Sequence, residues 1–113
     1  MPQQDNTIDY VEFPGRDLPA VKAFYGAAFG WTFTDYGPEY ASFDRAGTDG
    51  GFAADGSLTA PLVILYAADL EAAQAKVEAA GGKISRPIFS FPGGRRFHFT
   101  DPAGNELAVW TMA

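Results

Sequence analysis

The sequence predicts an α+β fold of two βαβββ modules in tandem, which form a curved mixed sheet around a cup with helices on the outer faces. Two observations carry this prediction. The 113-residue chain repeats the order of its features at an offset of 52 residues, close to half its length. Its composition, 47% hydrophobic and 19% charged, is that of a folded domain rather than a disordered chain.

The repeat is visible when residues 10–13 are placed over residues 62–65 and the comparison continues without gaps. In both halves an extended run leads to Asp-Leu, then to an alanine-containing helical stretch, then to glycine. This shared order is a stronger signal than the alanine matches themselves. The matching positions are Asp17-Leu18 with Asp69-Leu70, and Gly30 with Gly82.

Residues 55–60 are small and polar and fall between the two halves, so we interpret them as a linker. The predicted organisation is one domain over residues 1–113, with module one at about 7–54 and module two at about 61–111. Neither module alone can bury both faces of its sheet, which makes the cup that they share the expected place for a ligand.

Module one begins with residues 7–13, which alternate and contain the β-branched and aromatic residues typical of a half-buried strand. Asp17 is placed to cap the following helix, because its carboxylate can accept from the free amides of the first turn. Gly30 is the expected left-handed cap at the other end. The apolar side of this helix is predicted to contain Leu18, Val21, Phe24, Tyr25 and Ala28. Three short strands are expected at about 31–36, 40–45 and 51–54, with a turn at 47–50.

Module two repeats this order. A strand at about 61–67 precedes a helix that is capped by Asp69 and stops at Gly81-Gly82. Three more strands are expected, with proline- and glycine-marked turns between them. The strands lie at about 83–91, 95–100 and 105–111, and the turns at 92–94 and 101–104.

Charge and residue usage exclude several function classes. The net charge is −6 with only eight Lys and Arg, so neither nucleic acid nor an anionic membrane surface is an expected partner. There is no cysteine, which excludes disulfides, thiolate catalysis and cysteine-ligated metals. The first residues, Met-Pro-Gln-Gln-Asp-Asn-Thr, have neither the basic nor the apolar region of a signal peptide, so we expect a cytoplasmic protein.

Three stretches of the sequence carry a family resemblance, and together they span almost the whole chain. They are Tyr10-Val11-Glu12-Phe13-Pro14-Gly15-Arg16-Asp17-Leu18, then Ala23-Phe24-Tyr25 with Phe29-Gly30-Trp31, and finally Asp101-Pro102-Ala103-Gly104-Asn105-Glu106-Leu107. With these motifs the chain resembles the glyoxalase/bleomycin-resistance/dioxygenase superfamily, also called the vicinal oxygen chelate superfamily. The resemblance implies the fold given above. It does not identify one activity, because this scaffold carries several chemistries and some purely binding roles.

The resemblance also implies where a metal would be bound. Enzymes of this family hold a divalent metal in the cup with His, Glu or Gln from inward-facing strand positions. Those positions fall on Tyr10, Leu62 and Ala108 in this sequence, and the chain has a single histidine. Leucine and alanine cannot bind a metal, so we expect neither the usual metal site nor a cofactor.

Strand alternation predicts what the cup contains instead. An apolar and aromatic wall is expected from Tyr10, Leu62, Ile64, Tyr66 and Trp110. The polar groups expected on the same side are Glu12, Arg96, His98 and Glu106. The residues between them along the strands are expected to form the core on the opposite side: Phe13, Phe97, Phe99, Leu107 and Val109.

His98 and Glu12 are the candidate catalytic residues. The unperturbed pKa of an imidazole lies near neutrality, so His98 suits general acid or base catalysis if Glu12 or Glu106 lies within reach. A hydrogen-bonded strand histidine without a catalytic role is the alternative. Arg96 is interpreted either as the partner of an acidic ligand or as the partner of one of these two carboxylates.

Three functions remain open from the sequence. The leading hypothesis is a metal-independent member of the superfamily that binds a small organic molecule in the aromatic-lined cup. A second is an enzyme related to lactoylglutathione lyase or to the dioxygenases, with a displaced metal site built from Glu12, His98 and Glu106. A third is a drug-sequestering protein of the bleomycin-resistance type, which binds a cationic glycopeptide. The resemblance also implies a homodimer.

Overall fold

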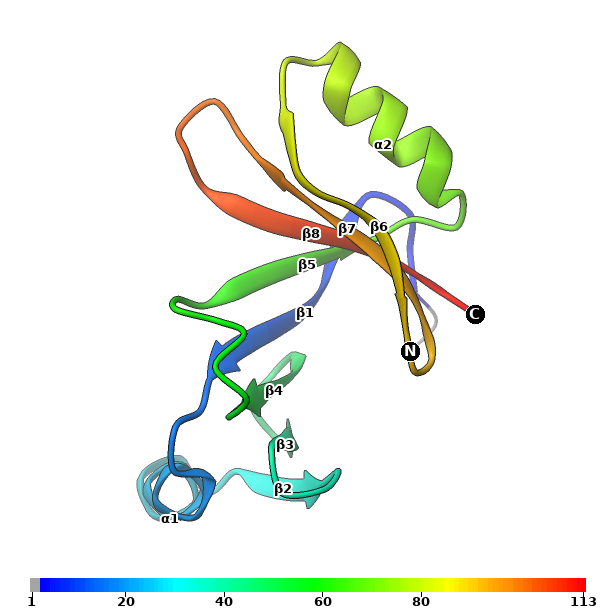
Figure 1. The fold of residues 1–113 in the computed structure, drawn as a ribbon. Helices are drawn as coiled ribbons and strands as arrows, with labels where there is room; N and C mark the ends of the chain where they lie inside the picture. The colour runs from blue at the N-terminus through cyan, green and yellow to red at the C-terminus, as the bar shows by residue number, and fades with distance from the viewer. Residues whose placement is uncertain (1–2) are drawn as a thin grey trace. The chain divides into compact units, whose positions relative to one another are not determined.

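The structure is a computed structural model, and it describes residues 3–113. Met1 and Pro2, at the start of the stretch examined for a signal peptide, lie outside the described residues. The elements are β1 (Thr7–Pro14), α1 (Leu18–Phe29), β2 (Thr32–Asp35), β3 (Tyr40–Asp44), β4 (Asp49–Ala53), β5 (Leu62–Tyr66), α2 (Leu70–Ala79), β6 (Lys83–Phe91), β7 (Gly94–Thr100) and β8 (Glu106–Met112) (Figure 1). This order confirms the predicted α+β class and the two βαβββ modules in tandem.

The chain separates into two compact units, which are described one at a time. The module-one unit is Tyr10–Leu62, and the module-two unit is Val63–Ala113 together with the described residues up to Asp9. The predicted module boundaries, about 7–54 and 61–111, stay a prediction. Among residues 3–113, neither helix is long and apolar enough to cross a membrane.

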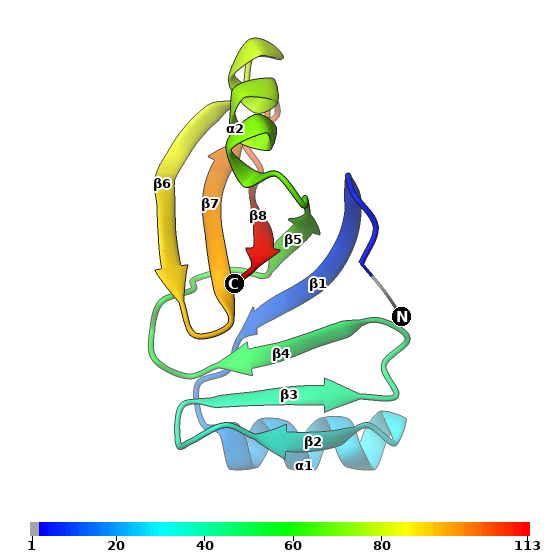
Figure 2. The ribbon, with the colours of Figure 1, turned by 90° about the vertical axis from the view of Figure 1, so that its right-hand side faces the viewer.

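In the module-one unit the strands lie in the order β2-β3-β4-β1, and Figure 2 shows β2, β3 and β4 side by side. β1 is parallel to β4, whereas β3 is antiparallel to both β2 and β4. A parallel pair needs a crossover connection, which here contains α1. Asp17 accepts a hydrogen bond from the Ala20 amide at 3.3 Å, and Gly30 ends the helix with a left-handed φ of 75°. Both predicted caps are confirmed.

One face of this sheet packs against α1. The buried residues of that core are Leu18, Ala41, Phe43 and Phe52, with Phe13, Tyr25 and Trp31 packed against them. Trp31 stacks on Tyr25 with ring centroids 4.7 Å apart. At the surface, Lys22 of α1 forms a 2.8 Å ion pair with Asp35 of β2.

The predicted apolar side of α1 was too wide. Phe24 is 59% exposed and Ala28 is also exposed, so neither belongs to the core. The helix meets the sheet along a narrower stripe that includes Leu18, Val21 and Tyr25, spaced three and four residues apart. Phe24 lies one step around the helix, with its ring edge-on to Tyr25 at 5.0 Å.

In the module-two unit the strands lie in the order β5-β8-β7-β6, the same arrangement as in module one. β5 is parallel to β8, and β7 is antiparallel to both β8 and β6. The Asp69 carboxylate caps α2 by accepting from the Ala72 amide at 3.0 Å, as predicted. The helix covers one face of the sheet, where the buried residues are Ala67, Leu70, Phe97 and Val109.

Two glycines that we assigned to turns lie instead in strands. β4 begins at Asp49 and therefore includes Gly50, and β7 begins at Gly94. A methyl group on Gly50 would collide with the Phe43 ring, and one on Gly94 would collide with the Thr111 carbonyl oxygen. Close approach by a neighbouring strand, rather than turn geometry, explains glycine at these positions.

Replacing Phe97, which is fully buried beneath α2, should test the packing of the module-two core. Phe97→Ala is expected to lower the free energy of unfolding by about 3–5 kcal/mol, because it removes a large ring from a close-packed site. Phe24→Ala is the matched control, and its effect should stay within about 0.5–1 kcal/mol because Phe24 is exposed. Urea unfolding measures both values. Equal losses for the two variants would contradict this assignment of the core.

Candidate functional site

The face of the module-two sheet opposite α2 collects most of the predicted site residues. Cross-strand pairing arranges them in two rows across β5, β8, β7 and β6. The first row is Ile64, Ala108, His98 and Arg86, and the second is Tyr66, Trp110, Arg96 and Phe89. We call these eight residues the His98 face. The alternating residues Phe97, Phe99 and Val109 pack under α2, so alternation predicted the faces of β7 and β8 correctly.

The remaining site predictions belong to the module-one unit. Glu12 is buried at 9% exposure and Leu62 at 2%, and Tyr10 is half-buried. Their role in ligand binding stays a prediction.

His98 is held next to a carboxylate by the β7–β8 pairing. Its Nδ1 lies 3.5 Å from Oε2 of Glu106, and the same Glu106 oxygen accepts a 2.9 Å hydrogen bond from the Ser85 hydroxyl. The carboxylate favours a proton on Nδ1, so Nε2 is left as the acceptor nitrogen of the ring. His98 is only 6% exposed, and its Nε2 has no hydrogen-bond partner among residues 3–113.

The surroundings of His98 lower its pKa below the ordinary value of 6.5. Burial is the main cause, because it disfavours the charged imidazolium, and the positive charge of Arg96 is the next. Glu106 acts in the opposite direction, and Arg86 adds a smaller lowering effect. The imidazole is therefore neutral at pH 7.

Aromatic rings surround these polar groups. Phe89 lies 5.8 Å from the His98 ring, and Phe91 lies 6.4 Å from Trp110. Trp110 is also edge-on to Tyr66 at 5.6 Å, and its indole nitrogen donates a 2.9 Å hydrogen bond to Asp9. The anchored indole and its inclined ring neighbours make an apolar aromatic surface on the same side of the sheet as His98.

Sequence reasoning missed Arg86, Phe89 and Phe91 because strict alternation fails along β6. The register shifts between Ile84 and Arg86, and again between Arg86 and Phe89. These irregularities place Arg86 opposite His98 and Phe89 opposite Arg96, although the two β6 residues are an odd number of positions apart. The only sequence signal was the nearby Pro87, which is typical of an irregular edge strand.

A second polar cluster lies in the module-one unit. The hydroxyls of Tyr10 and Tyr40 form a hydrogen bond with each other. Burial is the main reason that the pKa of both hydroxyls lies above the usual value, and for Tyr40 the bond to Tyr10 raises it further. Both hydroxyls therefore remain protonated at neutral pH. Tyr40 was also missed, although alternation within β3 separates it from the core residues Ala41 and Phe43.

The residues present do not fit the metal site that the resemblance implies. Two of its three positions are the buried apolar residues Leu62 and Ala108, which offer no ligand atom. Within residues 3–113 no three His, Asp or Glu side chains come together as a group that could hold a metal ion. His98 and Glu106 supply only two donors.

A model of the Glyoxalase/Bleomycin resistance protein/Dioxygenase superfamily matches residues 7–109 of this chain. The chain therefore belongs to this superfamily, as the resemblance implied.

Solved structures show the same fold. The chain is similar to a structure described as an NAD-dependent benzaldehyde dehydrogenase from Legionella pneumophila, with a TM-score of 0.76, 15% identity, and coverage of 92% of this chain and 98% of that chain. For methylmalonyl-CoA epimerase from Mycobacterium tuberculosis the TM-score is 0.72 and the identity 14%, over 100% and 92% of the two chains. For a Mn(II)-bound glyoxalase from Novosphingobium aromaticivorans the TM-score is 0.68 and the identity 25%, and the match covers 97% of this chain but only 40% of the glyoxalase chain. The comparison with curated proteins gives no match.

The lowered pKa of His98 predicts how the stability of the protein depends on pH. Below about pH 6.5 the unfolded chain takes up a proton at this residue before the folded chain does, so the free energy of unfolding falls as the pH drops through this window. His98→Gln should make the dependence between pH 7.5 and 5.5 flatter. Urea unfolding of both proteins at several pH values measures it. An equally steep dependence in the variant would show that the pKa of His98 is not lowered by folding.

Proposed function

We propose that this chain is a metal-independent member of its superfamily that binds a small organic molecule on the His98 face. The observation that carries the proposal is the Nε2 atom of His98, which is buried without a hydrogen-bond partner in the described part of the chain. Leaving a buried polar atom unsatisfied costs about 1–3 kcal/mol. A bound molecule that donates a hydrogen bond to this nitrogen removes the cost.

The rest of the face suits a small ligand. Aromatic rings beside one or two polar groups are the usual lining of small-molecule sites, since the rings supply contact area and the polar groups supply orientation. Contact area is supplied here by the rings of Phe89, Tyr66 and Trp110, and orientation by His98. Leu62 and Tyr10 stay proposed ligand-binding residues.

The geometry also supports the predicted role of His98 in acid–base catalysis. A neutral imidazole with a proton on Nδ1 can accept a proton at Nε2 from a bound molecule, and Glu106 then stabilises the imidazolium that forms. Glu12 stays the proposed second catalytic residue.

A displaced metal site is the second candidate, favoured by the 3.5 Å approach of His98 to Glu106. The third ligand predicted from the sequence is Glu12, although no group of three His, Asp or Glu side chains among residues 3–113 could hold a metal ion. We also expect the cytoplasmic location and the homodimer predicted from the sequence.

Metal analysis combined with ligand binding tests the proposed function. Purified protein should contain metal far below one equivalent, and EDTA treatment should leave ligand affinity unchanged. Phenylacetate, phenylacetamide and phenethylammonium serve as probes, each an aromatic ring with a different polar end. At least one should bind at millimolar concentration and quench Trp110 fluorescence in a Trp31→Phe background, where Trp110 is the only indole.

His98→Phe should weaken the binding of phenylacetamide, whose amide N–H can donate to Nε2, at least about tenfold, because it removes the acceptor nitrogen while keeping a flat ring. The proposed function fails if none of the three probes binds. It also fails if the protein holds one equivalent of metal that is lost in His98→Phe and in Glu12→Gln, a result that would establish the displaced metal site.

A further inference from the structure

The charge of the His98 face differs from that of the whole chain. The chain carries a net charge of −6, but the charged residues in the two rows of this face are Arg86 and Arg96, with Glu106 beside His98 on the same side of the sheet. Arg86 stands opposite His98 and Arg96 stands opposite Phe89. The positive charge of each guanidinium lowers the pKa of His98, so both lie close enough to act on the imidazole.

Arg86 and Arg96 gather around one ring. The guanidinium carbon of Arg86 lies 3.8 Å from the Phe89 ring centroid, and that of Arg96 lies 5.4 Å from it. Arg96 also lies 5.6 Å from the centroid of Phe91. Stacking on a ring fixes the plane of a guanidinium while its N–H groups stay directed outward around the edge. The donor fork of Arg86, the guanidinium that lies nearest the Phe89 ring, is therefore positioned to recognise a carboxylate.

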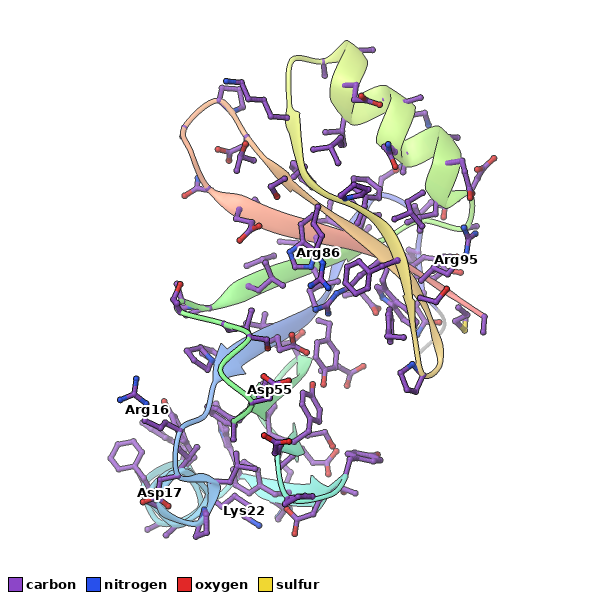
Figure 3. The ribbon with its side chains drawn as sticks, in the orientation of Figure 1. Arg16, Asp17, Lys22, Asp55, Arg86 and Arg95 are labelled. Carbon is purple, nitrogen blue, oxygen red and sulfur yellow. The ribbon has the colours of Figure 1, made fainter. Side chains whose placement is uncertain are left out.

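The irregular pairing of β6 builds this arrangement. Without the two register shifts, alternation would put Arg86 on the same side as Ile84 and Ile88, which pack against the core under α2. The shifts bring the exposed Arg86 side chain to the side of the buried His98 instead. Figure 3 shows Arg86 over the sheet, away from α2, whereas Arg95 lies beside the start of α2, where it pairs with Glu71 at 2.6 Å.

We propose that the ligand of the His98 face is an organic carboxylate that also carries a hydrogen-bond donor for Nε2 of His98, with its anionic end bound by Arg86 and its apolar part on Phe89 and Phe91. This inference rests on the proposed function and specifies the class of ligand. A carboxylate accepts from a guanidinium fork through two parallel hydrogen bonds, which a neutral amide or an alcohol cannot match.

Matched probes test the charge preference. Phenylacetate and phenylacetamide have nearly the same shape and differ in charge, and phenethylammonium carries the opposite charge. Phenylacetate should bind at least about tenfold more tightly than phenylacetamide, since hydrogen bonds to charged groups are the stronger ones. Phenethylammonium should bind more weakly than both. The readout is the fluorescence of Trp110 in the Trp31→Phe protein.

Two arginine variants show which arginine is responsible for the preference for phenylacetate over phenylacetamide. Arg86→Met should weaken phenylacetate binding about tenfold and leave phenylacetamide binding within about twofold. Arg95→Met removes the same charge from the α2 side of the sheet, so it should change neither affinity by more than about twofold. Thermal melting confirms that both variants fold.

The outcomes separate this inference from the proposed function. If phenylacetamide or phenethylammonium binds as tightly as phenylacetate, the site exists but does not select a carboxylate. Preferential binding of phenethylammonium would favour the cationic ligand of a drug-sequestering protein. Equal losses of phenylacetate affinity in Arg86→Met and Arg95→Met would also overturn the inference, because they would show a general effect of net charge. If no probe binds, the proposed function itself fails.

Discussion

Everything at the His98 face depends on α2 covering the opposite face of the same four strands. Leu70 and Phe97 are fully buried there, and the hydrophobic effect fixes which way each strand presents its residues. Since successive residues of a strand point to opposite faces, burying Phe97 and Val109 sends His98 and Trp110 to the other side. A shift by one residue would exchange the two sets, so the core and the site are specified together.

The same constraint explains the electrostatics of the site. The residues on either side of His98 along β7, Phe97 and Phe99, pack in the core under α2. The burial of His98 on the other face lowers its pKa and favours the uncharged imidazole. Glu106, at the first position of β8, is half exposed and holds the Nδ1 side of the ring. The two arginines then act on a neutral base rather than on another cation. A chain with a net charge of −6 thereby acquires a local preference for negative charge, which its overall composition did not indicate.

Most of the fold could be predicted because its signals are local and repeated. The 52-residue offset located both capping residues, Asp17 and Asp69, and alternation assigned the faces of β7 and β8. Two of the failures, at Gly50 and Arg86, have a common physical origin in contacts between strands. The strand position 50 has glycine because the Phe43 ring lies over it, and Arg86 reaches the site because the register of β6 shifts. Neither fact can be found from the spacing of residues within one strand.

His98 is a neutral imidazole whose Nε2 atom has no hydrogen-bond partner among residues 3–113 and can accept a hydrogen bond from a ligand. The chain contains one histidine, so nitrogen-detected NMR of labelled protein reports this ring alone. A titration should show a pKa below 6.5, with the proton of the neutral form on Nδ1, and Glu106→Gln should lower that pKa further because Glu106 raises it. A pKa at or above 6.5, or a proton on Nε2 in the neutral ring, would contradict the account.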